Sequence, residues 1–120
     1  MASSIPGRVL RKSVRVVSAG GAFDDLEIGP VPFGEQWLVR RVASMDDTNV
    51  VTKRGYAVKT GSYLYWLHET LTVTLDLRHG EELNTLLVAG ESLIVRLTGC
   101  TNLDVLWAWL TGEYWEVGEE

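Results

Sequence analysis

The chain has few of the residues on which disulfides, metal sites and nucleophilic catalysis depend. Its one cysteine, Cys100, cannot form an internal disulfide, so the fold does not need an oxidising compartment. The two histidines, His68 and His79, lie outside any H-x-H or H-E-x-x-H pattern, so the common zinc signatures are missing. No G-x-S-x-G elbow and no P-loop is present. We therefore expect no catalytic residue, no cofactor and no enzymatic activity.

Long hydrophobic runs and an excess of basic residues are also missing. The longest stretch without Asp, Glu, Lys or Arg is nine residues, 60–68, whereas a membrane-spanning helix needs about 20. Eleven basic residues against sixteen acidic ones give a net charge of −5, which disfavours a general nucleic-acid or anionic-membrane binder. With 120 residues, 46% hydrophobic and 22% charged, the composition is that of one globular domain.

Paired carboxylates occur twice, at Asp24-Asp25 and at Asp46-Asp47. Carboxylate oxygens suit Ca²⁺, but neither pair has the spacing of an EF-hand loop. Solvated turns are the favoured interpretation of both pairs, and we expect no metal site.

Period-two alternation of apolar and polar residues dominates from Gly34 onward. Its clearest example is Leu71, Val73, Leu75 and Leu77 alternating with polar residues. Seven to nine short strands, several apolar on both faces, predict an all-β fold: an antiparallel β-sandwich or jelly roll. Only Glu81–Ala89 predicts a short helix, from three leucines at helical spacing: Leu83, Leu86 and Leu87.

The first 33 residues differ from the rest. Arg8–Ser18 alternates only weakly, which suits a strand or an arm that becomes one by pairing with a neighbour. Pro30 and Pro32 fix the backbone and lack the N–H of a strand ladder, so they indicate a linker or an edge segment. We predict an extended N-terminal arm and linker over residues 1–33, followed by the sandwich domain over 34–120.

The five tryptophans are many for this length. We expect Trp37, Trp66 and Trp107 to pack in the core. Trp107 and Trp109 alternate on one face of the expected last strand, with Tyr114 and Trp115 close behind. That face has three interpretations: the core, a contact surface of the kind in which Trp and Tyr are enriched, or a platform for stacking sugars.

Charge is distributed unevenly between the two ends of the chain. Residues 1–23 contain four bases and no acid: Arg8, Arg11, Lys12 and Arg15. Residues 113–120 contain four acids and no base: Glu113, Glu116, Glu119 and Glu120. The ends suit complementary contacts between neighbouring subunits, with two solvated termini as the alternative. The expected interface residues are Arg8, Arg11, Lys12, Arg15, Trp109, Tyr114 and Trp115.

Three segments carry a resemblance to a known family. They are the W-x-V-x-x-V strand in Gly34–Val42, the Tyr-rich Tyr63–Leu67, and the Gly-Glu strand entry in Leu87–Val95. Through them residues 33–117 resemble the small jelly-roll structural proteins of tailed-bacteriophage virions.

The resemblance implies a virion protein assembled in the host cytoplasm, either a capsid decoration (cement) protein or a tail or fibre component. It implies as partners further copies of the chain, for example in a trimer, and the major capsid protein or other virion proteins. The resemblance carries no active-site residues. From the charge balance we expect no membrane and no nucleic acid as partner. The competing hypothesis is a carbohydrate- or host-surface-binding β-sandwich that uses Trp107, Trp109, Tyr114 or Trp115.

Overall fold

Eight antiparallel strands build the protein. The computed structural model describes residues 7–47, 51–71 and 78–117, without the side chains of residues 70, 71 and 78–81. The strands are β1 (Arg8–Val17), β2 (Phe23–Ile28), β3 (Glu35–Asp46), β4 (Lys53–Thr60), β5 (Tyr63–Leu71), β6 (Arg78–Val88), β7 (Ser92–Thr98) and β8 (Val105–Glu116). Over these residues there is no helix, and hence none long and apolar enough to cross a membrane.

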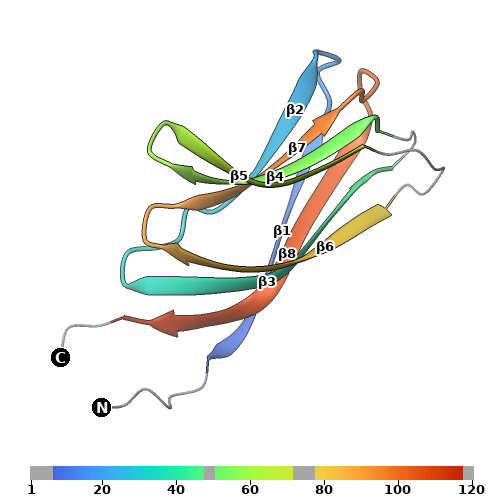
Figure 1. Cartoon of the computed structure of the whole chain (residues 1–120). Coiled ribbons are helices and arrows are strands. Elements are labelled where there is room, and N and C mark those ends of the chain that lie inside the picture. Colours follow the sequence, from blue (N-terminus) through green and yellow to red (C-terminus); the bar gives the residue numbers. More distant parts are fainter. Residues whose placement is uncertain (1–6, 48–50, 72–77, 118–120) are drawn as a thin grey trace.

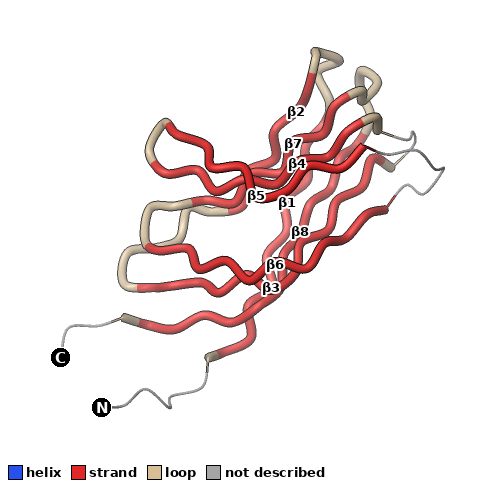
Figure 2. The backbone as a smooth tube through the Cα atoms, viewed as in Figure 1, coloured by secondary structure: helices blue, strands red, loops and turns tan. Residues whose placement is uncertain are grey.

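The strands form two four-stranded sheets that pack as a sandwich (Figure 1). Sheet A has the order β1-β8-β3-β6, and sheet B has the order β2-β7-β4-β5. The first half of the chain pairs with the second half in reverse order: β1 with β8, β2 with β7, β3 with β6 and β4 with β5. The tube in Figure 2 follows this antiparallel course. The predicted all-β antiparallel sandwich is confirmed.

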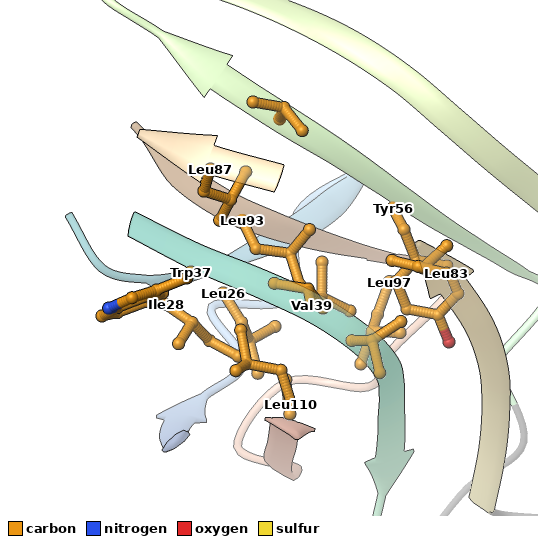
Figure 3. Packing of buried hydrophobic residues seen from close by; sticks show 14 of the residues in the cluster. Leu26, Ile28, Trp37, Val39, Tyr56, Leu83, Leu87, Leu93, Leu97 and Leu110 are labelled. Atoms are coloured by element: carbon orange, nitrogen blue, oxygen red, sulfur yellow. The ribbon is translucent and has the colours of Figure 1, made fainter. Parts of the chain in front are cut away.

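The core lies between the inner faces of the two sheets (Figure 3). Sheet A contributes alternate residues, so Leu106, Ala108 and Leu110 of β8 are buried. Sheet B contributes Leu93, Val95 and Leu97 of β7 in the same way. Ser44 of β3 and Tyr56 of β4 are both fully buried, and their hydroxyls are hydrogen-bonded at 3.2 Å, which links the two sheets.

A β-bulge bends sheet A where β3 passes β8. The pairing moves from Val39–Gly112 to Arg41–Thr111, so Arg40 has no opposite residue on β8. Gly112 lies so close to the carbonyl oxygen of Leu38 that a Cβ atom would overlap it. This close approach of two backbones explains why a glycine stands inside a long strand.

The predicted helix at Glu81–Ala89 is wrong, because these residues belong to strand β6 and the turn that follows it. Leu83 and Leu87 are buried and four residues apart, a spacing that fits one face of a strand as well as a helix. Leu86 instead lies on the exposed side. Residues 81–88 form a strand and not a helix because β6 pairs with β3 along its length.

The extended N-terminal arm is not confirmed. β1 pairs with β8 and β2 with β7 of the same chain, so residues 8–17 and 23–28 are strands of the two sheets. The proline segment after β2 is a connection, as predicted, and its Val31 is buried and hydrogen-bonded through the backbone to Gly90 and Glu91. Residues 1–6, most of the expected strand at 71–77 and the end of the acidic tail, 118–120, lie outside the described residues.

Candidate binding surfaces

The basic and acidic ends of the chain meet on neighbouring strands of one molecule. β1 and β8 are antiparallel, with Arg8 opposite Tyr114 and Ser13 opposite Trp109. Arg8 and Glu116 form an ion pair at 3.7 Å, and both side chains are about two-thirds exposed. A hydrogen bond with Tyr114 and the charge of Glu116 raise the pKa of Arg8. The charge complementarity predicted between subunits is thus met in part within one chain.

The seven predicted interface residues lie on both sides of sheet A, because successive side chains of a strand point to opposite faces. Tyr114 packs against the core, and Lys12 lies with its Nζ 5.5 Å from the ring centre of Trp37. The other side of the sheet, which we call the outer face of sheet A, carries the residues that alternate with the buried ones. Its predicted interface residues are Arg11, Arg15, Trp109 and Trp115.

Two tryptophans lie side by side along β8 on the outer face of sheet A. Trp107 and Trp109 are half-buried and flank the fully buried Ala108, so they point away from the core. The strands on either side place small residues opposite Trp109, namely Ser13 on β1 and Ala43 on β3. The expectation that Trp107 packs in the core is therefore wrong, whereas Trp37 does lie there.

The outer face of sheet A carries more positive than negative charge. Arg40 pairs with Glu113 at 3.1 Å, and Arg41 lies 4.0 Å from Glu82. Arg11 and Arg15 on β1 are exposed and have no carboxylate within 4.0 Å among the described residues. The guanidinium carbon of Arg15 lies 5.9 Å from the ring centre of Trp107. Two unneutralised cations thus border two half-exposed indoles.

The outer face of sheet B is built differently, around a stacked arginine. Arg96 of β7 donates two hydrogen bonds to Asp25, at 2.7 and 2.9 Å. Its guanidinium carbon lies 3.8 Å from the ring centre of Phe23 and 4.9 Å from that of Trp66. The pKa of Arg96 is raised, chiefly by the bond with Asp25. Gly55 makes room for this stack, because a Cβ there would lie 2.7 Å from the Trp66 ring.

Ion pairs neutralise the cations of this second face. Besides Arg96 with Asp25, Lys53 pairs with Glu69 at 3.1 Å and Lys59 with Glu27 at 3.5 Å. Next to the stack lies a shallow pocket of about 190 Å³, lined by Phe23, Lys53, Gly55, Trp66, Glu69, Arg96 and Thr98. Trp66 is about 39% exposed, so the expectation that it packs in the core is also wrong.

Two of the remaining candidates, Cys100 and the Asp24-Asp25 pair, have other surroundings than a reactive site needs. Burial, with nearby carboxylates, raises the pKa of the Cys100 thiol to about 12, which leaves it protonated and unreactive at neutral pH. Asp24 accepts hydrogen bonds from Ser18 and Ala19 while Asp25 binds Arg96 on the opposite face, so the pair does not converge on one cation. Within residues 7–47, 51–71 and 78–117, no three His, Cys, Asp or Glu side chains are placed to hold a metal.

The sequence did not identify the stack on sheet B. Phe23, Arg96 and Trp66 are far apart in the chain, and only the order β2-β7-β4-β5 brings them together. The available signal was Gly55, a glycine inside a strand, which often marks a close approach. No protein-family model matches the chain, and no curated protein is significantly similar to it in sequence.

Proposed function

We propose that this chain is a non-enzymatic structural protein of a tailed-phage virion, a decoration or cement protein that docks on the assembled head and associates with further copies of itself. The strand order supports the class. The pairing of β1 with β8, β2 with β7, β3 with β6 and β4 with β5 supports a jelly-roll topology, an arrangement common in viral capsid domains. The resemblance carried by Gly34–Val42, Tyr63–Leu67 and Leu87–Val95 supports the same class.

We place the docking surface on the outer face of sheet A because of its unpaired arginines and exposed tryptophans. The outer face of sheet A exposes Trp107 and Trp109 beside Arg11 and Arg15, which have no acidic partner among the described side chains. On the outer face of sheet B, by contrast, Lys53, Lys59 and Arg96 are paired with carboxylates. Trp and Arg are the residue types enriched at the energetic centres of protein interfaces. A positively charged face on a chain of net charge −5 fits an acidic protein surface, toward which it also steers the approach.

The test uses particles of the parent phage assembled without this chain, to which the purified protein is added back. We expect wild-type protein to sediment with the particles and the double variant Arg11→Glu, Arg15→Glu to stay in solution. The matched control is Lys53→Glu with Lys59→Glu on the opposite sheet, which gives the same net charge of −9 (−5 minus 4). Equal binding of the two variants would contradict the proposed docking face, and no binding of wild-type protein would contradict the decoration role.

A tail or fibre position is the alternative within the same class. The same face would then dock on tail proteins, and the reconstituted heads would not bind the chain while complete virions would contain it.

A carbohydrate- or host-surface-binding module is the second candidate function, and the pocket on sheet B favours it. The exposed Trp66 and Phe23 rings can stack on a sugar, and Glu69, Lys53 and Thr98 supply hydrogen-bonding groups. At about 190 Å³ the pocket is smaller than the usual 300–1,000 Å³ of ligand sites, so it fits a single sugar ring. Tryptophan fluorescence that changes with a neutral monosaccharide in wild-type protein, but not in Trp66→Phe, would support this function.

A further inference from the structure

Strand β5 has one charged residue, Glu69, which is fewer than any of the three other edge strands. Edge strands expose an unpaired ladder of N–H and C=O groups, and proteins protect such edges with charged residues. β1 carries four bases, β2 carries Asp24, Asp25 and Glu27, and β6 carries Arg78, Glu81 and Glu82. In β5, the segment Tyr63–His68 contains no charged residue.

The side chains of β5 are also unusually apolar for an exposed edge. Tyr63 is 72% exposed and Tyr65 is 61% exposed, with Trp66 and Leu67 each about 39% exposed. β5 is the terminal strand of sheet B and is hydrogen-bonded to β4 on its other side (Figure 1). A register shift opposite Tyr56–Ala57 makes Leu67 an extra residue, so the regular part of the edge is Tyr63–Trp66.

We propose that β5 pairs antiparallel with β5 of a second copy of this chain about a twofold axis, which joins two B sheets into one eight-stranded sheet. Like charges disfavour self-pairing of two of the other edges, β1 and β2. Antiparallel self-pairing of β1 would set bases opposite bases, and that of β2 would set acids opposite acids, both of which are destabilising. Self-pairing through Tyr63–Trp66 sets only uncharged side chains opposite one another.

The side-chain alternation limits the register. The twofold axis of an antiparallel pair in one sheet is perpendicular to the sheet, so residues opposite each other must lie on the same face. With Tyr65 opposite Tyr65 of the second copy, Leu64 lies opposite Trp66, and both are on the outer face of sheet B. Aromatic and aliphatic cross-strand pairs of this kind stabilise antiparallel sheets.

The β5–β5 pairing specifies how copies of the chain associate, which the proposed function leaves open. The pairing itself does not require a virion, and only its role on a particle rests on the proposed function. Because the twofold axis is perpendicular to sheet B, both copies present the outer face of sheet A on the same side of the dimer. Two docking faces can then bind one particle surface together, which raises the apparent affinity without any new contact.

The first test is the mass of the purified full-length chain, measured by light scattering over a wide range of concentrations. We expect twice the 13.4 kDa chain mass for wild-type protein and a monomer for Tyr65→Lys. Val9→Lys is the matched control, because Val9 is a similarly exposed apolar residue on the β1 edge, and it should remain dimeric. A monomeric wild-type protein, a trimer, or a Tyr65→Lys variant that keeps the dimer mass would overturn the inference.

The second test fixes the register. Tyr65→Cys should form a covalent dimer under mild oxidation or with a short bis-maleimide, and Val9→Cys should not. Cys100 is buried, so it does not compete for the reagent. A dimer that Tyr65→Cys fails to cross-link contradicts the assigned register. Particle binding is measured separately for wild-type protein and Tyr65→Lys. A monomeric Tyr65→Lys variant that binds particles more weakly than wild-type protein supports both proposals. A dimeric wild-type protein that binds no particle contradicts the proposed function alone.

Discussion

The guanidinium carbon of Arg15 lies 5.9 Å from the ring centre of Trp107, and the two residues are direct partners in the pairing of β1 with β8. The basic start and the aromatic end of the chain therefore form one continuous surface. The residues alternating with them, such as Val16 and Leu106, fill the core, so the same pairing both stabilises the sandwich and builds the outer face of sheet A.

Particle binding should depend on ionic strength through the two unneutralised arginines. We expect added salt to weaken wild-type binding, because exposed charges are screened over roughly 8–10 Å at physiological ionic strength. Arg11→Gln with Arg15→Gln should bind more weakly at low salt and respond less to added salt. Co-sedimentation at a series of salt concentrations measures this, and an unchanged salt response in the variant would show that these arginines do not face the partner.

Gly112 should tolerate no side chain. In Gly112→Ala the new Cβ meets the Leu38 carbonyl oxygen, and both groups belong to paired strands that cannot separate without losing the β3–β8 pairing. We expect a loss of more than about 2 kcal/mol in the free energy of unfolding, measured in urea. Gly21→Ala is the control, since a Cβ at Gly21 meets nothing closer than 4.0 Å, and its stability should be near wild type.

The stack on sheet B should couple Arg96 to Trp66. A double-mutant cycle with Arg96→Gln and Trp66→Leu should give a coupling of about 0.5–1 kcal/mol, the size expected for a partly exposed cation–π contact. Both single variants should remain folded, because Arg96 and Trp66 lie outside the buried core. Additive single-variant effects would show that the contact contributes no stability of its own.

The Cys100 thiol should make stability fall at high pH. Its pKa rises from 9.0 to about 12 on folding, so the unfolded chain loses the proton first. This stabilising contribution is complete below pH 9 and is lost as pH rises toward 12. Urea unfolding of wild-type protein should show that decline, and Cys100→Ala should show a smaller one. Equal slopes in the two proteins over this range would contradict the assignment.

Short-range sequence patterns predict most strands correctly, but they do not predict β1 and β6 correctly. Alternation in Ser92–Thr98 and Val105–Leu110 predicts strands there, and strands β7 and β8 confirm this prediction. Leu83 and Leu87 misled because a four-residue spacing fits both a helix and a strand. The weak alternation of Arg8–Ser18 fits both an arm and an edge strand, because an edge strand with one exposed face also carries charged residues.

The sequence predicts a surface feature only where all of its residues belong to one strand. Trp107 and Trp109 were correctly placed on a common face, but which face of the sheet is buried depends on Leu106, Ala108 and Leu110 packing inward. Alternating indole and aliphatic residues give no preference between the two. The Arg96 stack depends on three strands and a glycine distant in sequence, so no local pattern contains it.

The most direct measurement is a cryo-electron-microscopy map of the parent virion in which this chain is located. We expect density for the sandwich on the head, with the outer face of sheet A turned toward the shell. Arg11, Arg15, Trp107 and Trp109 mark that face. Density on the head with that face turned to solvent would contradict the docking surface, and virions without the chain would contradict the proposed function.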